Sequence, residues 1–242
     1  MISQKIVRLL NYCMPPIWYK VMSKAYEISL PKLTGDLKDI NLSGQALKKL
    51  LKDYEFETVL DIGSGAGKHA KIFSENQKSV TALDFGTSIY AEQKGSNYEN
   101  VKYVEVDFLS YDPGQKFDCV WASHVLEHQA DPGTFIKKCM KLTREDGIIS
   151  ITVPPMEDYV LGGHLTNWNA GLLIYHLVLN GLDCSQCSIL SYGYNISVLV
   201  KNNRRADVDL SFDNGDITKL LKYFPACITS EPFNGRIRRW NW

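Results

Sequence analysis

The sequence has no surplus of charge of either sign, because 27 Lys and Arg residues balance 27 Asp and Glu residues over 242 positions. Proteins whose main partner is a nucleic acid usually carry a basic excess, so this balance argues against that class. Hydrophobic residues make up 45% and charged residues 22%, as in globular rather than disordered chains. The length is sufficient for one α/β domain with its own core.

Long hydrophobic runs are also missing. The most apolar stretch, Gly171–Leu182, is too short to span a bilayer and contains His176 and Asn180. The first residues include Lys5 and Arg8, and no small-residue cleavage site of a signal peptide follows them. We therefore expect a cytoplasmic protein whose cysteines are free thiols.

The six cysteines lack the spacing of a zinc site. Cys184 and Cys187 form a C-x-x-C pair, but no second pair lies at the required distance. The pair enters an expected strand, whereas a thioredoxin-like pair lies between a strand and a helix. We expect these cysteines to pack in the core, with no metal or redox role.

What the sequence does contain is a regular alternation of apolar runs and helical patterns. The runs expected as strands are Thr58–Asp61, Val80–Asp84, Val101–Val106, Phe117–Ser123 and Gly147–Val153. The expected helices are Lys68–Asn76, Ser88–Lys94, Pro132–Leu142, Trp168–Leu182 and Ile217–Phe224. Such an alternation predicts right-handed crossovers and a mostly parallel sheet covered on both faces.

The ends of the chain differ from this central pattern. Cys184–Leu190 and Tyr194–Val200 are β-rich and meet at a Tyr-Gly turn, which predicts an antiparallel hairpin at a sheet edge. Ile2–Tyr12 has the pattern of an amphipathic helix. We expect a helical lid over residues 1–45, a core over residues 46–201 and an extension over residues 202–242.

A glycine-rich loop, Gly63–Gly67, follows the first expected strand within the segment Val59–His69. Its glycines are spaced G-x-G-x-G, which differs from the G-x-G-x-x-G of dinucleotide-binding folds. A P-loop is excluded because Ile62 and His69 stand where that motif needs Gly and Ser or Thr. The loop nevertheless allows a sharp turn and a close approach of backbone to a ligand.

Polar residues follow the other strands at the same edge of the sheet. Asp84 ends the second strand, where a carboxylate can accept both hydrogen bonds of a ribose diol. Asp107 and Phe108 follow the third strand, and Ser123 and His124 follow the fourth. Open α/β sheets bind ligands at these carboxyl ends.

Taken together, the motifs resemble those of the class I S-adenosylmethionine-dependent methyltransferases, over about Glu57–Lys201. The Leu126-Glu127-His128 element is similar to the branch that includes ubiquinone-biosynthesis and sugar O-methyltransferases. The resemblance implies an α/β, Rossmann-like, doubly wound single domain with a seven-stranded sheet, mostly parallel with an antiparallel last strand. It implies S-adenosylmethionine as cofactor and S-adenosylhomocysteine as product. The cofactor-binding residues it implies are Asp61, Gly63, Ser64, Gly65, Gly67, Asp84, Phe85, Asp107, Phe108, Ser123 and His124.

Within that set the resemblance gives each residue a role. Asp61 and the glycine loop would hold the methionine part of the cofactor, Asp84 the ribose, and Asp107 with Phe108 the adenine. In some relatives an acid at the position of His124 joins the following Glu and His in binding a divalent metal. Because His124 replaces that acid here, no metal is expected.

A base is needed only when the acceptor must lose a proton. The catalytic candidates are His164, His128 and Asp158, with His164 first because it lies in a Gly-flanked loop after the fifth strand. Tyr159 and His124 face the same end of the sheet and remain alternatives for contact with the acceptor.

The loop Met156–Asn169 mixes polar and aromatic residues, which favours a hydroxylated small-molecule acceptor such as a sugar or a cell-envelope saccharide. A quinone or other aromatic acceptor is the nearest alternative. The tail Arg236–Trp242 is the one feature that favours nucleic acid, and it is equally expected to pack on the body through Trp240 and Trp242. Together with Ile2–Tyr12 it also leaves peripheral contact with an anionic, lipid-bearing surface open. The oligomeric state stays undetermined.

Overall fold

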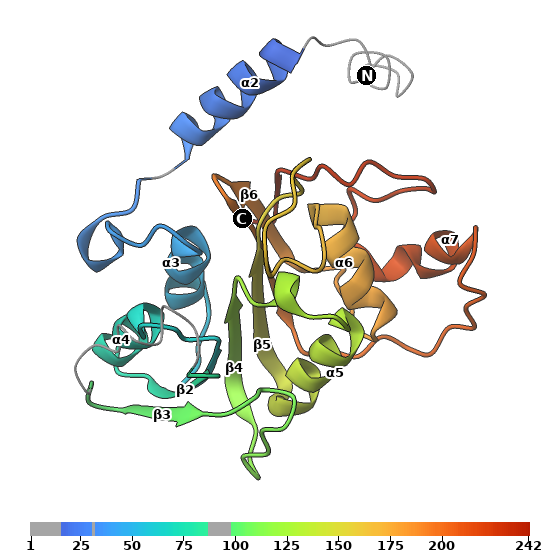
Figure 1. Cartoon of the computed structure of the whole chain (residues 1–242). Coiled ribbons are helices and arrows are strands. Elements are labelled where there is room, and N and C mark those ends of the chain that lie inside the picture. The colour runs from blue at the N-terminus through green and yellow to red at the C-terminus, as the bar shows by residue number, and fades with distance from the viewer. Residues whose placement is uncertain (1–15, 31, 87–97) are drawn as a thin grey trace. The chain divides into compact units, whose positions relative to one another are not determined.

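The computed structural model describes residues 16–30, 32–86 and 98–242, in two compact units over residues 1–33 and 34–242 (Figure 1). The first unit contains helix α2 (Pro16–Ser29), in which Val21 and Ile28 are exposed. The helices expected at Ile2–Tyr12 and Ser88–Lys94 lie outside the described residues. Among the described helices, none combines the length and the apolar character needed to cross a membrane.

The second unit alternates strands and helices, as the sequence predicts. Its strands are β1 (Thr58–Ile62), β2 (Ser79–Asp84), β3 (Val101–Glu105), β4 (Phe117–Ser123), β5 (Thr143–Val153), β6 (Ser188–Tyr192), β7 (Asn195–Lys201) and β8 (Arg239–Trp240). Its α-helices are α3 (Gly44–Asp53), α4 (Lys68–Glu75), α5 (Pro132–Leu142), α6 (Ala170–Leu179) and α7 (Asp216–Leu220), and its 3-10 turns are η1 (Gly35–Leu37), η3 (Leu126–His128) and η4 (Leu221–Tyr223).

All eight strands form one sheet in the order β3-β2-β1-β4-β5-β7-β6-β8. Strands β1 to β5 pair in parallel, whereas β7 is antiparallel to both β5 and β6. This order confirms the Rossmann-like, doubly wound fold. The expected count of seven strands is corrected to eight, because the two-residue strand β8 pairs with β6 at the edge. Two residues are too few to show a strand period in the sequence.

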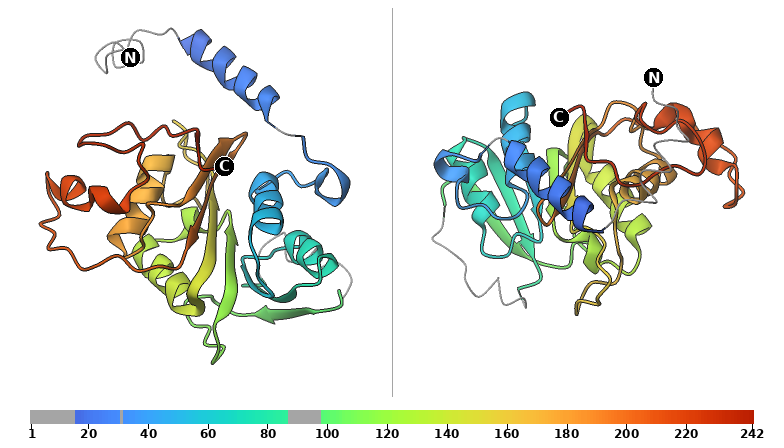
Figure 2. Two further views of the ribbon diagram at one scale, coloured as in Figure 1. Left: turned by 180° about the vertical axis from the view of Figure 1, so that it is seen from behind. Right: turned by 90° about the horizontal axis from the view of Figure 1, so that it is seen from above.

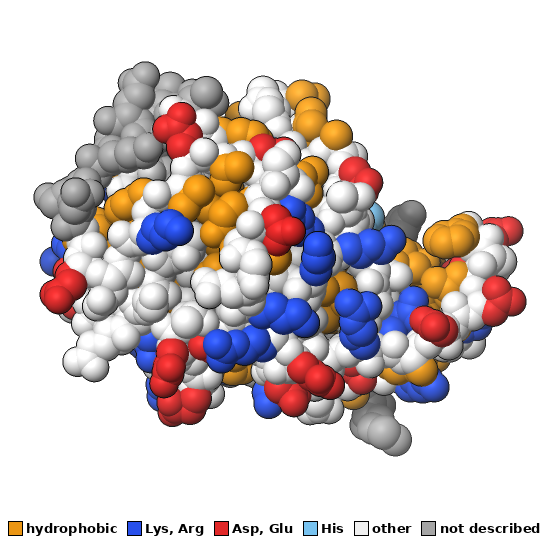
Figure 3. Space-filling view, turned by 90° about the horizontal axis from the view of Figure 1, so that it is seen from below, with side chains coloured by type: hydrophobic (Ala, Val, Ile, Leu, Met, Phe, Trp, Pro, Cys, Tyr) orange, Lys and Arg blue, Asp and Glu red, His pale blue; other side chains and the backbone are white. Residues whose placement is uncertain are grey.

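The eighth strand also shows where the C-terminal tail lies. Trp240 pairs with Ile189 and packs against the core, and the Trp242 ring lies 5.5 Å from Lys49 Nζ. The tail therefore packs on the body through both tryptophans, as one of the two sequence interpretations expects. On the face drawn in Figure 3, basic side chains lie among acidic ones rather than forming a field of one sign.

Successive residues of the central strands point to opposite faces of the sheet and pack in two separate cores. Val59 of β1 packs under α3 and α4, and its neighbour Leu60 packs toward α5 and α6. Figure 2 shows these helices on opposite faces of the sheet. Parallel strands covered on both faces are near-continuous apolar runs, which is why the sequence located them well.

Helix α3 has no counterpart among the expected elements. It buries Ala46, Leu47 and Leu50 along one face, a spacing of one and four residues that fits a short amphipathic helix. The expected boundary between lid and core, at residue 45, falls within this helix. The division into a lid, a core and an extension stays a prediction. Residues 39–42, which precede the helix, line the site described below.

Candidate active site

The glycine loop between β1 and α4 needs glycine for two physical reasons. Gly63, Gly65 and Gly67 all have positive φ, at 68°, 50° and 73°. A Cβ on Gly63 would lie 2.5 Å from Val125 Cγ2, and a Cβ on Gly67 would lie 2.6 Å from the Tyr103 hydroxyl. The loop backbone therefore packs closely on Val125 and Tyr103, and Ser64 N donates to Leu83 O at 2.9 Å.

Asp84, at the end of β2, is fixed by the backbone around it. Its Oδ2 accepts from Gly65 N at 2.8 Å, and its Oδ1 accepts from Gly86 N at 3.0 Å. Each carboxylate oxygen can accept a second hydrogen bond. The residue thus joins the glycine loop to the cavity and still has two acceptor positions.

Asp61 lies one residue before the end of β1 and is almost fully buried, at 1% exposure. Its Oδ2 has no hydrogen-bond partner, and the hydroxyl of Tyr103 is likewise buried and unpaired. Burial, and then the nearby charge of Asp84, raise the pKa of Asp61 to about 8. A buried acid without a partner is a group that a cationic ligand would stabilise in its charged form.

Asp107 and Phe108 follow β3 and line the cavity. They differ in their contacts, because Asp107 is hydrogen-bonded to its own turn and Phe108 is buried against another ring. The carboxylate of Asp107 accepts from Leu109 N at 3.0 Å and from the Ser110 hydroxyl at 3.3 Å. The Phe108 ring packs on Phe135 with centroids 4.9 Å apart and is only 6% exposed. Little of that ring is left for stacking on a ligand.

A cavity of about 840 Å³ extends across the carboxyl ends of β1, β2, β3 and β4. Most of the residues expected to bind a cofactor line it. These are Gly63, Ser64, Gly65, Asp84, Phe85, Asp107, Phe108, Ser123 and His124. Asp61 and Gly67 do not line the cavity.

His69, which begins the first turn of α4, also lines the cavity. Its Nδ1 accepts from Trp121 Nε1 at 3.3 Å, so its hydrogen is on Nε2, which donates to Leu42 O at 3.1 Å. Burial lowers the pKa of His69 to about 4. The uncharged His69 ring thus links α4 to the segment before α3 through its hydrogen bond to Leu42 O.

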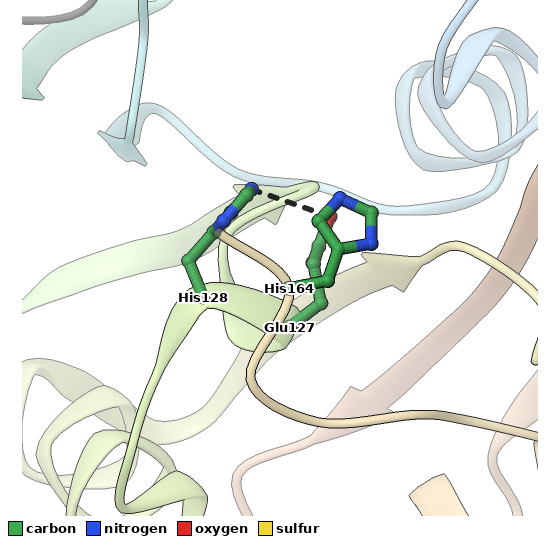
Figure 4. Close-up of side chains that lie close together, drawn as sticks. All are labelled: Glu127, His128 and His164. Atoms are coloured by element: carbon green, nitrogen blue, oxygen red, sulfur yellow. Dashed lines mark ion pairs between the residues drawn. The ribbon is translucent and has the colours of Figure 1, made fainter. Parts of the chain in front are cut away.

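His128, at the end of η3, is oriented by a single hydrogen bond. Its Nδ1 lies 2.7 Å from Gly163 O, and because a carbonyl only accepts, Nδ1 carries the hydrogen. The free Nε2 lies 3.9 Å from Glu127 Oε1. Figure 4 shows this ion pair and the ring of His164 beside it.

Glu127 is completely buried, and neither of its carboxylate oxygens has a hydrogen bond. His124 Nδ1 lies 3.3 Å from its Oε1, while His124 Nε2 lies 3.0 Å from Asn195 Oδ1. Two acceptors that face each other attract only when a proton or a cation lies between them. The carboxylate is thus built to share a positive charge with the histidines around it.

His164 and Asp158 differ in placement. The His164 ring lies edge-on to that of His128, with centroids 4.9 Å apart, and the residue lines the cavity. Asp158 is exposed and lines neither this cavity nor the smaller one beside it. Among the described residues, Glu127, His128 and His164 place ligand atoms within 4.8 Å of one another, a set with which a divalent cation is chemically compatible.

The smaller cavity, of about 260 Å³, shares His164 and Tyr194 with the larger one. It lies under residues 156–165, a loop in which Val160 is 94% exposed. Most of its other lining residues are apolar or aromatic: Pro154, Pro155, Tyr159, Val160, Leu161, Leu165 and Trp168.

Sequence reasoning missed several residues of the site. Residues 39–42 and Tyr194 line the cavity. Ser43 and Asn195, which are 152 positions apart, support its wall through a hydrogen bond from Ser43 N to Asn195 Oδ1. No local motif marks such a long-range pair. Glu127 was visible as part of the Leu-Glu-His element, but its burial between two histidines appears only in the fold.

Comparison with known proteins agrees with this architecture. A model of the methyltransferase domain family matches residues 60–151. A ubiquinone biosynthesis O-methyltransferase of Glaesserella parasuis is 30% identical over 135 residues, covering 49% of this chain and 56% of the relative. The corresponding protein of Coxiella burnetii is 32% identical over 122 residues, covering 47% and 51%.

The chain is thus similar to methyltransferases in the sequence of residues 60–151 and in its fold. It spans about half the length of the curated relatives it matches. A solved 1,6-didemethyltoxoflavin N1-methyltransferase of Burkholderia thailandensis superposes with a TM-score of 0.55 at 20% identity, covering 81% of this chain and 92% of its own. At that identity the likeness concerns the fold alone.

Proposed function

We propose that the protein transfers a methyl group from S-adenosylmethionine to a hydroxyl of a small aromatic acceptor. The observation that carries the proposal is that one cavity joins the glycine loop and Asp84 to the histidine cluster around Glu127. The relatives named as ubiquinone biosynthesis O-methyltransferases support an oxygen acceptor on a quinol-like ring.

The residues of the larger cavity fit the cofactor. The two remaining acceptor positions of Asp84 suit a ribose diol. Asp61 does not line the cavity, so it would act on a bound ammonium group through its charge rather than by a direct hydrogen bond. Gly63, Ser64 and Gly65 line the cavity, so the backbone of the glycine loop can approach the methionine part closely. When bound, the cofactor supplies an electrophilic methyl group on a positively charged sulfur with a neutral leaving group.

The chain itself supplies orientation and a place for the proton. Because Gly163 O holds the hydrogen of His128 on Nδ1, Nε2 is free to accept a proton from an acceptor hydroxyl. The Nε2–H formed then faces the Glu127 carboxylate, which stabilises the charged ring. This geometry favours His128 as the base, whereas the sequence favoured His164.

The smaller cavity supports an aromatic acceptor over a saccharide. Tyr159, Trp168 and Tyr194 give its wall aromatic rings against which a planar acceptor can pack. Thr166, Asn167 and Glu157 are its polar exceptions and keep a hydroxylated acceptor as the second candidate.

Formation of S-adenosylhomocysteine tests the proposal on pools of catechols and quinols, nucleotide-linked sugars, and RNA. We expect turnover with the aromatic pool, and product formation with sugars or RNA alone would contradict the acceptor class. In single turnover at saturating cofactor, His128→Ala is expected to slow transfer roughly a hundredfold or more. His164→Ala is the matched control, and a larger loss in that variant would return the base to His164.

A further inference from the structure

Asn195, the first residue of β7, connects two parts of the cavity wall that are far apart in the chain. It is buried, at 3% exposure, and its Oδ1 has two partners. The backbone N–H of Ser43 donates to it at 2.9 Å, and His124 Nε2 lies 3.0 Å from it. One side-chain oxygen thus serves both the segment before α3 and a histidine of the cavity.

These two contacts fix which nitrogen of His124 carries hydrogen. A backbone N–H can only donate, so the Asn195 atom facing Ser43 is the oxygen and not the amide nitrogen. An oxygen facing Nε2 requires a hydrogen on that nitrogen. His124 therefore presents Nδ1 to Glu127, at 3.3 Å from Oε1.

The backbone of His124 has an unusual positive φ of 56°. Its N–H donates to Thr152 O at 2.9 Å, and its ring stacks on Tyr194 at 16° with centroids 5.9 Å apart. These contacts set the ring plane, but a ring flip would exchange Nδ1 with Cδ2 and Nε2 with Cε1. The Asn195 oxygen distinguishes the two orientations.

Ser43 is held just as closely at the other end. It is fully buried with a φ of 56°, and its hydroxyl lies 2.6 Å from that of Ser123. The four residues before it line the cavity, and Leu42 O accepts from His69. Release of the Ser43 N–H would therefore loosen the cavity wall on the side of the glycine loop.

We propose that Asn195 is a positioning residue that sets the orientation of His124 and holds residues 39–43 against the cofactor cavity. Its role for turnover rests on the proposed function, whereas its two hydrogen bonds exist without any ligand. Losing the shared acceptor leaves two buried donors unpaired, which is costly in a protein interior. Acceptor chemistry and cofactor binding should consequently weaken together.

Two substitutions distinguish the loss of the acceptor oxygen from a change in packing, because both replacing side chains are close to Asn in size. Asn195→Asp keeps an acceptor oxygen in place, and Asn195→Leu keeps the volume without an acceptor. In the full chain without cofactor, ¹⁵N spectra of the histidine rings report the protonated nitrogen, with His124→Asn used to assign the signal. Hydrogen exchange reports protection of the Ser43 amide.

We expect hydrogen on Nε2 of His124 and a protected Ser43 amide in the wild type and in Asn195→Asp. Asn195→Leu should lose both and should weaken S-adenosylhomocysteine binding and single-turnover methylation roughly tenfold or more each. Asn195→Asp should stay within about threefold of wild type for both.

Wild-type His124 with hydrogen on Nδ1 and none on Nε2 would overturn the proposal even if Asn195→Leu fails to fold. Equal behaviour of the Leu and Asp variants would also overturn it, because packing alone would then explain the site. If the protein binds no cofactor, the proposed function fails, while the spectra and the exchange rates still decide the role of Asn195.

Discussion

Replacing Asp61 with Asn should change how the stability of the protein depends on pH. The carboxyl is 1% exposed, its Oδ2 has no partner, and burial raises its pKa to about 8. In the unfolded chain the same group titrates near its ordinary pKa of about 3.9. Between these two values the folded protein holds one proton that the unfolded chain has released.

The sign of the effect follows from this proton. Because the folded state binds more protons, stability falls as pH rises from about 4 to about 8, by about 1.4 kcal/mol per pH unit at most. From pH 5 to pH 7 the loss is about 2.6 kcal/mol. His69, whose pKa burial lowers to about 4, has the opposite effect below its ordinary value. It is present in both proteins and cancels in the difference.

The assay is urea unfolding of wild type and Asp61→Asn, without cofactor, at half-unit steps from pH 5 to pH 8. The wild-type free energy of unfolding minus that of the variant should decrease steadily over this range. A difference that stays constant with pH would refute the buried, protonated carboxyl. Saturating S-adenosylhomocysteine should flatten the decrease, because a nearby ammonium favours the ionised form.

Three further outcomes are expected. Gly63→Ala should abolish binding of S-adenosylhomocysteine in calorimetry, because the added Cβ would collide with Val125. Gly114 has a similar φ of 66° but open space around it, so Gly114→Ala should bind normally. Equal binding by the two variants would contradict the tight packing of Gly63 on Val125. Dialysis against EDTA should leave the transfer rate unchanged, and a lost rate restored by an added divalent cation would instead assign that ion to the Glu127 cluster. Deletion of the residues up to Gly35 should slow acceptor turnover while circular dichroism shows the sheet intact, and full turnover would remove the lid role of that segment.

The sequence predicted those parts of the fold that depend on local pattern. The strand β1, the glycine loop and Asp84 follow one another within 27 positions, and each has a physical reason in its own residue types. Parallel strands buried on both faces are continuous apolar runs, so β2 and β4 were found almost at their observed bounds.

What the sequence could not predict depends on contacts between distant segments. Ser43 and Asn195 meet only because β7 inserts beside β5 and α3 packs above it. The strand β8 exists because β6 offers it an edge, and its own two residues carry no period. Glu127 has an ordinary place in the sequence beside His124 and His128, and its complete burial without a hydrogen bond is visible only in the fold.

Calorimetric titration of S-adenosylhomocysteine into wild type and Asp84→Asn tests the central claim most directly, which is that the larger cavity holds the cofactor through the acid at the end of β2. The control is Asp112→Asn, an exposed acid outside the cavity whose carboxylate also accepts a backbone N–H. The account predicts saturable one-to-one binding to wild type and to the control. It predicts binding weaker by about 2 kcal/mol or more in Asp84→Asn, which is roughly thirtyfold, because a charged acceptor of two hydrogen bonds is lost. No binding to wild type, or equal affinity for wild type and Asp84→Asn, would contradict it.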